Sequence, residues 1–476
     1  MMRLMRRIAL VNERIRERLS KTGWLNLALY ATFLSIYFLL RIANIVSIEE
    51  IMTFPDSETY TDMMASRSLL DSAFWYGFRP FTVPLVYKLL GSDPQAIGVF
   101  QSGLSMLCWS LLALSVSRGI RLQWLRPIAF ATILVLSLST DIILWDWVIL
   151  SESISLSLLA LFIAGWLWLL KGWQWRKAAI VAIVGLFWVF SRDSNAWVIM
   201  TVAALLALIS LVLRGQQRYF VLAGLFVAFF IAYDVPWKVG EPRGNTENIR
   251  DVTRQDFHEI AVDEILQARI LPFADRTAYF AEHGMPVTSA LMERSGKPAS
   301  SDNWAFLTDP ALKEFRDWQY KYGQSTYVRF LLSSPLWTAV EPLRYPTELL
   351  HFPNKMVYFP HGFSPILTGL LDETVYPQSL LVFLNKWALV CLLLAGIVVS
   401  LVISVMAWRQ RNAAWFTALV IVGLAYPHAL IVVHGNPGEI GRHAVAINAQ
   451  LGIGLWMLLL FGIDIVCLRR LSGTNL

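Results

Sequence analysis

The feature that most constrains this chain is a series of ten apolar segments, each about as long as a membrane-spanning helix. The segments lie at about 24–45, 96–117, 127–147, 154–170, 177–191, 195–213, 219–234, 379–407, 413–433 and 444–467. A helix needs ~20 apolar residues to cross the hydrocarbon core of a bilayer. Charged residues make up only 16% of the chain, whereas soluble proteins carry roughly 25%. The sequence therefore predicts an all-α polytopic membrane bundle of about ten transmembrane helices.

The distribution of basic residues predicts how these helices are oriented. The proposed cytoplasmic segments carry 19 Lys and Arg residues, and the short outer segments carry five. Because cytoplasmic loops are enriched in Lys and Arg, this alternation places both termini in the cytoplasm. The first apolar segment is too long for a signal-peptide core, so we interpret it as an uncleaved anchor. The net charge of +6 then reflects orientation and does not indicate a nucleic-acid partner.

Two long segments lie on the predicted outer side. The first, about 47–95, contains a proline-interrupted aromatic stretch that is typical of interfacial helices. The second is long enough to fold as a domain, and the amphipathic stretches Phe257–Ala268 and Ala311–Tyr322 predict that it is mainly helical. The predicted domains are an N-terminal membrane module at 1–235, an outer domain at 236–377 and a C-terminal membrane module at 378–476.

Ionisable side chains at membrane depth are costly, and here nearly all of them fall on the predicted outer side. In the first outer loop, Asp56 and Glu58 follow Pro55, and Arg79 begins the interfacial stretch. Asp56 and Glu58 are therefore functional candidates. A plain helix cap made by Asp56, with Ser57 as the competing cap, is the alternative.

Three further candidates lie at turns between predicted spans. Asp146 and Glu152 flank one outer turn, where they would face outer water or a site, and solvation of the hairpin is the alternative. Arg192 stands beside Asp193 in a tight turn, and adjacent opposite charges in such a turn are usually solvated. Both turns could therefore be structural rather than functional.

The last outer loop, VVHGNPGEIGRHAVAIN, places Arg442 and His443 where the final span begins. A guanidinium there can bind a phosphate in a bidentate manner, and snorkelling to lipid headgroups is the alternative. The histidines lack the spacing of a helical metal-ligand pair, so we predict no metal site and leave a divalent cation open. No P-loop, dinucleotide fingerprint, nucleophile elbow or zinc-protease motif occurs in a suitable context.

Taken in order along the chain, these motifs resemble those of the polytopic glycosyltransferases of the C superfamily. The matching elements are Asp56 in PDSETY, the stretch RPFTVPLVYKLLG from Arg79, Ser151-Glu152, Arg192, and Arg442 in GRHAV. The resemblance covers about 1–235 and 378–467. The acidic motif reads Asp-Ser-Glu, and His443 stands where many members have an aromatic residue.

The resemblance implies an enzyme that moves a sugar from a polyprenyl-phosphate carrier to a lipid, glycan or protein acceptor at the outer leaflet. Asp56, with Glu58, would be catalytic, and Arg79, Asp146, Glu152, Arg192, Arg442 and His443 would bind substrate. No cofactor is required, and the setting would be glycan synthesis in a bacterial plasma membrane. A polymerase or ligase of lipid-linked glycans would instead rely on outer-domain cations and histidines such as His351 and His361. A transporter is a further alternative.

Overall fold

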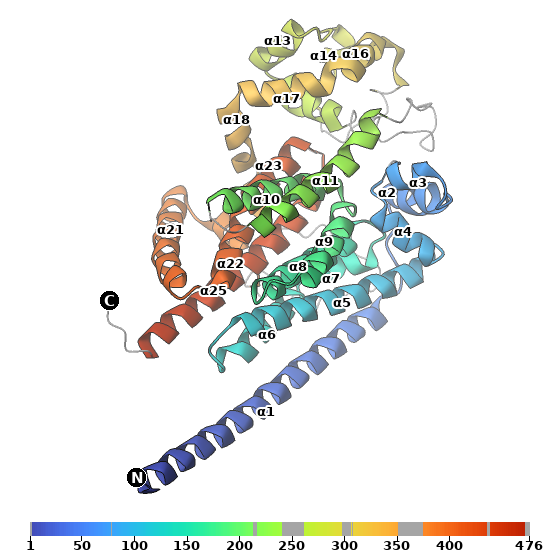
Figure 1. Cartoon of the computed structure of the whole chain (residues 1–476). Coiled ribbons are helices and arrows are strands. Elements are labelled where there is room, and N and C mark those ends of the chain that lie inside the picture. The colour runs from blue at the N-terminus through green and yellow to red at the C-terminus, as the bar shows by residue number, and fades with distance from the viewer. Residues whose placement is uncertain are drawn as a thin grey trace.

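The computed structural model describes residues 2–77, 79–212, 217–239, 261–297, 306, 308–350, 375–435 and 438–471. Within these ranges the chain is helical and contains no β-strand beyond one isolated bridge between Met52 and Val148. The predicted all-α polytopic membrane bundle is therefore confirmed. Figure 1 shows the helices of the bundle below a smaller helical domain, with both chain termini on the side away from that domain.

Eight helical stretches in the described part of the chain are long and apolar enough to cross a membrane. They are formed by α1 (Met2–Ser47), α5 (Pro94–Gly119), α8 (Glu152–Leu170), α10 (Asp193–Val212), α11 (Gln217–Val239), α21 (Lys386–Arg409), α22 and α23 (Ala413–Gly423 and Ala425–Gly435), and α24 and α25 (Ile440–His443 and Val445–Leu471). In α1 the apolar part is Trp24–Ser47.

The two other predicted spans differ from straight transmembrane helices. One is a bent pair in which α6 (Leu125–Leu136) meets α7 (Thr140–Ile143) and η2 (Leu144–Trp147) at 58°. The other, α9 (Trp175–Val189), has 15 residues, which corresponds to a length of about 22 Å. The bend falls at Ser137, whose hydroxyl bonds back to the Leu134 carbonyl, and whose own carbonyl accepts a 3.3 Å hydrogen bond from Arg41.

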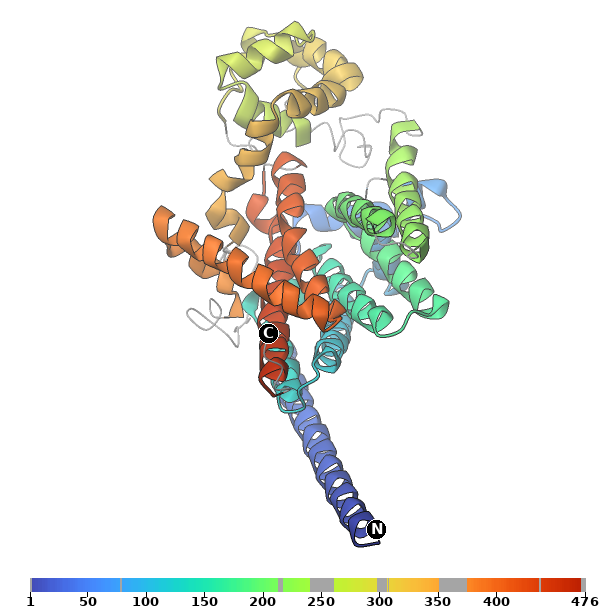
Figure 2. The same ribbon diagram turned by 60° about the vertical axis from the view of Figure 1, so that its left-hand side comes forward.

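Close helix packing builds the main core. α5 packs against α6 and α8, and α22 packs against α25. Small residues allow these approaches, because a Cβ on Gly454 of α25 would lie 2.7 Å from Val422 of α22. In contrast, the apolar window of α21 has none of its residues buried inside the protein. Figure 2 shows α21, in orange, crossing the front of the bundle on its outside. Its side chains are therefore available to lipid.

The first outer segment forms short helices beside the bundle. These are α2 (Pro55–Glu58), the π-helical turn η1 (Thr59–Ala65), α3 (Ser72–Tyr76) and α4 (Thr82–Leu89). The Tyr87 hydroxyl of α4 donates a 2.7 Å hydrogen bond to the Leu150 carbonyl. The segment is therefore fixed against the chain that leads into α8.

The smaller domain has its own apolar core, which includes Phe280, Phe315 and Trp318. Its described elements are η4 (Leu266–Ile270), α13 (Ala274–Glu282), α14 (Ser289–Met292), η5 (Pro310–Leu312), α16 (Lys313–Trp318), η6 (Gln319–Gly323), α17 (Gln324–Ser333), α18 (Pro335–Val340), η7 (Glu341–Arg344) and α19 (Pro346–Leu350), with η9 (Pro377–Phe383) leading into α21. The predicted stretch Ala311–Tyr322 is helical. Part of Phe257–Ala268, and both His351 and His361, lie outside the described residues.

Candidate active site

Asp56 is the second residue of α2, so its carboxylate is not at the cap position. The Ser57 hydroxyl accepts a 2.9 Å hydrogen bond from the Phe54 N–H and donates a 2.7 Å hydrogen bond to the Ile149 carbonyl. Ser57 therefore fixes the start of α2 against the segment that precedes α8. This arrangement leaves the Asp56 carboxylate available for other partners.

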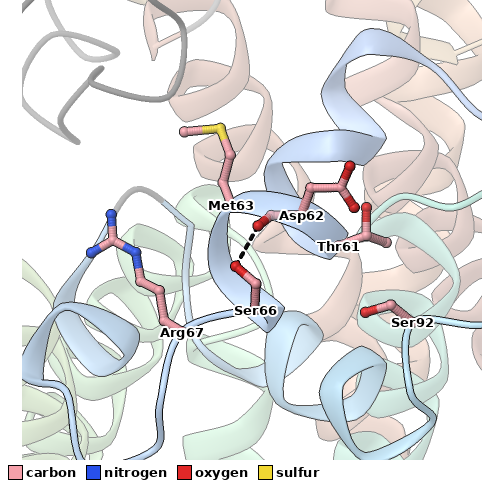
Figure 3. A pocket seen from close by; sticks show the side chains of 6 residues that line it. All are labelled: Thr61, Asp62, Met63, Ser66, Arg67 and Ser92. Atoms are coloured by element: carbon pink, nitrogen blue, oxygen red, sulfur yellow. Dashed lines mark hydrogen bonds between the residues drawn. The ribbon is translucent and has the colours of Figure 1, made fainter.

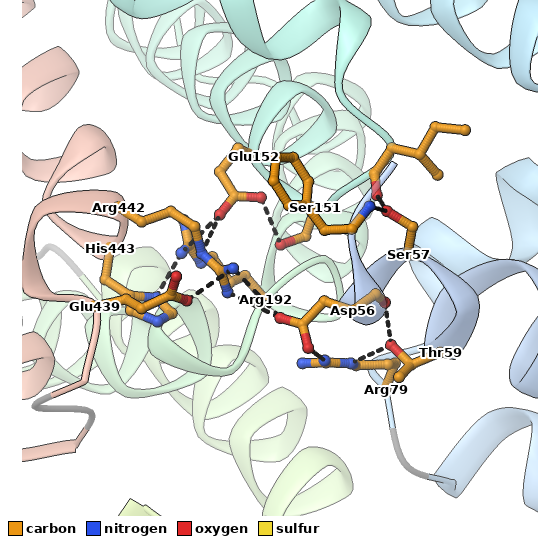
Figure 4. A network of polar contacts seen from close by, with 12 residues as sticks. Asp56, Ser57, Thr59, Arg79, Ser151, Glu152, Arg192, Glu439, Arg442 and His443 are labelled. Atoms are coloured by element: carbon orange, nitrogen blue, oxygen red, sulfur yellow. Dashed lines mark hydrogen bonds and ion pairs between the residues drawn. The ribbon is translucent and has the colours of Figure 1, made fainter. Parts of the chain in front are cut away.

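Two arginines from distant parts of the chain contact Asp56 (Figure 4). Arg79 Nη2 lies 3.2 Å from Oδ1, and Arg442 Nη2 lies 3.2 Å from Oδ2. Partial burial alone would raise the pKa of Asp56, but these two guanidinium groups outweigh it and hold that pKa below its ordinary value. Asp56 is thus held as a carboxylate while both arginines remain in place.

Arg79 is positioned by the first outer segment itself. Its Nε donates a 2.9 Å hydrogen bond to the Thr59 hydroxyl, and its guanidinium carbon lies 4.8 Å from the centre of the Tyr60 ring. Planar stacking and hydrogen bonding together fix a guanidinium in one orientation. Residues of its own segment therefore help to orient the buried Arg79 toward Asp56.

Glu152 holds two arginines together at the start of α8. Its Oε1 lies 3.2 Å from Arg192 Nη2 and 3.2 Å from Arg442 Nε. The Glu152 side chain is only 2% exposed, and Arg192 is also buried. The alternative interpretation of two solvated turns is therefore wrong, because the turns pack against the first residues of the last span instead of facing water.

Arg442 contacts three carboxylates at once. Besides Asp56 and Glu152, its Nη1 lies 2.8 Å from Glu439 Oε2, one helical turn earlier. The shared guanidinium links the first outer segment, α8 and the last outer loop (Figure 4). With Arg79 and Arg192, the cluster contains three cations and three carboxylates, so its formal charges balance.

His443 contacts Arg192. Its Nδ1 lies 2.5 Å from Arg192 Nη2. Since a guanidinium can only donate, Nδ1 must be the acceptor in this contact, and the Arg192–His443 pair then carries one positive charge. Arg192, which directly precedes α10, is thus a second cation beside Arg442.

Two predicted site residues lie apart from this cluster. Asp146 is buried in an ion pair with Arg41 and accepts a 2.6 Å hydrogen bond from Ser153. It therefore does not face outer water, because the bend after α6 turns it into the bundle. Glu58 is exposed, and no ion pair joins it to another described residue.

Glu439 belongs to the cluster although the sequence analysis did not select it as a site residue. Its spacing of three from Arg442 was the available signal, because residues three apart face each other on a helix. Thr59 and Tyr60 were likewise not selected, and nothing in their local sequence indicates that they hold Arg79. Their role depends on the fold of α2 and η1.

A shallow cavity of about 630 Å³ lies on η1, and no residue of the cluster lines it. Figure 3 shows its lining side chains, which are Thr61, Asp62, Met63, Ser66, Arg67 and Ser92. It is therefore a polar surface within a few residues of Asp56. Among the described residues, no group of three or more His, Cys, Asp or Glu side chains is arranged to hold a metal ion.

No protein-family model and no curated protein matches this chain. Among solved structures, it is similar to the archaeal oligosaccharyltransferase AglB from Archaeoglobus fulgidus, in complex with an inhibitory peptide and a dolichol-phosphate. The TM-score is 0.45 and the sequence identity 12%. The match covers 95% of this chain and 52% of that protein, so this chain spans about half its length. At this TM-score the similarity assigns no residue role to this chain.

Proposed function

We propose that this protein is an integral-membrane glycosyltransferase that moves a sugar from a polyprenyl-phosphate carrier to a lipid, glycan or protein acceptor. The observation that carries the proposal is the contact of Arg442 with both Asp56 and Glu152. This contact brings a carboxylate close to several guanidinium groups near the ends of membrane helices. These are the two kinds of group that the reaction needs, a base for the acceptor and cations for the leaving phosphate.

The proposed reaction is a single displacement at the anomeric carbon. An acceptor hydroxyl attacks that carbon, and its proton passes to the Asp56 carboxylate. The bond between the anomeric carbon and the phosphate oxygen breaks, and the phosphate leaves with the electron pair. Arg442 and the Arg192–His443 pair stabilise the charge on the departing phosphate. The displacement inverts the anomeric configuration.

The contacts with Arg79 and Arg442 hold Asp56 in a poorly basic state. Arg79 and Arg442 lower its pKa, and a carboxylate with a lowered pKa is a weak proton acceptor. A phosphodiester that binds Arg442 would compete with Asp56 for this guanidinium, because it brings its own negative charge and two further acceptor oxygens. The pKa of Asp56 would then rise. Donor binding would thereby prepare the base.

The remaining members of the cluster act as positioning residues in this proposal. Buried Glu152 keeps Arg192 and Arg442 side by side, and Glu439 restrains Arg442 from its own helical turn. Arg79 orients Asp56. The exposed Glu58 has no part in proton transfer, which makes it a matched control for Asp56.

The reaction would take place at the outer leaflet of the plasma membrane. The support is the excess of basic residues in the loops on the side of the two termini. The carrier tail would enter between helices from the lipid, and the smaller domain would stand over the outer surface. The cavity on η1 would be the binding site of an acceptor.

The proposal is tested by comparing membranes with and without the protein. Mass spectrometry of glycolipids, glycans and glycoproteins should show one sugar-bearing product that disappears when the protein is absent, while a polyprenyl-phosphate sugar accumulates. Loss of a long glycan polymer, with an unchanged level of monosaccharide carrier, would favour the polymerase or ligase alternative. An unchanged set of glycoconjugates would reject both.

A further inference from the structure

A second, basic cavity lies at the far end of the membrane helices from the Asp56 cluster. It measures about 310 Å³ and is lined by Ser115, Arg118, Trp168, Lys171 and Lys177. Glu152 begins α8 and Lys171 follows its last residue. The 19 residues of this helix separate the two sites by about 28 Å. The cavity is therefore distinct from the candidate active site.

The lining of the basic cavity carries three cations and no carboxylate. No ion pair joins Arg118, Lys171 or Lys177 to another residue in the described ranges. Burial, together with the charges of Arg118 and Arg126, lowers the pKa of Lys171 to about 8. The cations of this group therefore repel one another, and a bound anion would reduce that repulsion.

One acidic group at this end of the bundle is already engaged. Asp464 of α25 accepts hydrogen bonds from the backbone N–H groups of Arg121 at 3.0 Å and Leu122 at 2.8 Å. The loops at 118–126 and 171–177 contain no Asp or Glu. An anion for the basic cavity would therefore have to come from outside these loops.

An apolar surface leads from the basic cavity toward the middle of the membrane. Leu107 and Leu111 precede Ser115 at intervals of four residues, so all three lie on one face of α5. Leu107 is 56% exposed and Leu111 is 37% exposed. Trp168 is also exposed, and Lys177 Nζ lies 5.1 Å from its ring centre. Cations at headgroup level above an exposed apolar face match a lipid better than a soluble anion.

We infer that this cavity is a binding site for the phosphate headgroup of an anionic membrane lipid, with Arg118 and Lys171 contacting the phosphate. The acyl chains lie along Leu107 and Leu111. Because the cavity joins α5, α8 and α9, the headgroup holds the ends of these three helices together. The inference does not depend on the proposed enzymatic activity.

The test compares two double variants of the full-length protein that lose the same charge. Arg118→Gln with Lys171→Gln removes two lining cations, whereas Arg176→Gln with Arg409→Gln removes two exposed cations outside the cavity. Each protein in uncharged detergent is titrated with phosphatidylglycerol, phosphatidylcholine or inorganic phosphate. Binding is read by native mass spectrometry and by the shift in thermal unfolding.

We expect the wild type and the Arg176/Arg409 variant to bind phosphatidylglycerol in preference to phosphatidylcholine. The Arg118/Lys171 variant should bind phosphatidylglycerol about thirtyfold more weakly, since each basic side chain near a membrane surface contributes about fivefold. Equal weakening in both double variants would overturn the inference, as would equal binding of both lipids. Binding of inorganic phosphate as tight as that of the lipid would overturn the lipid assignment.

A second variant guards against failure of the double variant to fold. Ser115→Phe fills the cavity without a change of charge and should likewise abolish preferential lipid binding. Gly103→Ala, on the same helix, meets no atom within 4 Å and should leave lipid binding unchanged. Normal binding by the Ser115→Phe variant would contradict the site.

Discussion

At the scale of single residues, Arg442 is the residue that links the parts of the candidate site. Its guanidinium lies 3.2 Å from Asp56 and from Glu152 and 2.8 Å from Glu439. Three carboxylates around one cation are stable here because Arg79 and Arg192 supply the other two charges. A phosphate that enters the site would compete with the carboxylates for Arg442, which contacts all three of them.

Replacement of Arg442 by Lys should show whether the forked geometry matters. A lysine keeps the charge but cannot contact several oxygens in one plane. We expect kcat/KM for the donor to fall by about 10- to 150-fold, which corresponds to the loss of one hydrogen bond to a charged group. The exposed Arg344, paired with Glu341 at 3.3 Å, provides the control Arg344→Lys. Equal activity of the two variants would remove Arg442 from the phosphate site.

The pH dependence should reveal whether donor binding frees Asp56. The two arginines hold the pKa of Asp56 below its ordinary value, so kcat/KM for the donor should fall only at pH values below the ordinary range of an aspartate. Once phosphate has drawn Arg442 away, the pKa of Asp56 rises, and kcat should fall at a higher pH. Coincident acid limbs in the two profiles would contradict this coupling.

The sequence indicated several candidates but not their contacts. Residue type and the predicted side of the membrane were enough to select six candidates that the structure brings into one cluster. They are Asp56, Arg79, Glu152, Arg192, Arg442 and His443. The burial of Glu152 and Arg192 could not be predicted, because their partners lie 40 to 290 residues away in the chain. Asp146 was misplaced for the same reason, since its partner is Arg41 on the first helix.

At the scale of helices, hydropathy located the spans but not their shapes. The apolar segment at 127–147 reads as one helix, although Ser137 and Ser139 interrupt it and the structure bends there by 58°. Serine hydroxyls that compete for backbone groups are a known cause of such bends, so this feature could have been predicted. The contact between α22 and α25 could not, because no local pattern shows which glycine meets another helix.

Gly454 should be sensitive to a single methyl group. A Cβ there would lie 2.7 Å from Val422 Cγ2 and 3.3 Å from the Val422 backbone nitrogen. We expect Gly454→Ala to destabilise the protein by about 1–3 kcal/mol through overpacking, measured by thermal unfolding in detergent. Gly103→Ala on α5 has open space around it and should cause no loss. Equal unfolding temperatures would show that α22 and α25 do not pack closely.

At the scale of the whole molecule, the chain separates its chemistry by side. The N-terminal part of α1 and the loop between α5 and α6 lie at one end of the bundle, and α2 and the smaller domain lie at the other (Figure 1). The composition predicts a membrane protein, and the basic loops predict which end of the bundle is cytoplasmic. The fold of the smaller domain could not be predicted from the sequence, because amphipathic stretches predict helices but not how those helices pack.

Cysteine labelling should test this orientation. On a background in which exposed Cys391 is replaced by Ser, Lys313→Cys places a thiol on the smaller domain and Arg176→Cys places one in a basic loop. A membrane-impermeant maleimide should label the cysteine at 313 in intact cells and the cysteine at 176 only after permeabilisation. The reverse pattern would place the Asp56 cluster in the cytoplasm.

The central claim is that Asp56 is the base of a sugar transfer, and the most direct measurement is complementation followed by mass spectrometry of the product. Cells that lack the protein should regain the sugar-bearing product with the wild type and with Glu58→Gln. Asp56→Asn, at normal protein levels, should yield no product and should leave the polyprenyl-phosphate sugar unused. Full product formation by Asp56→Asn would contradict the account.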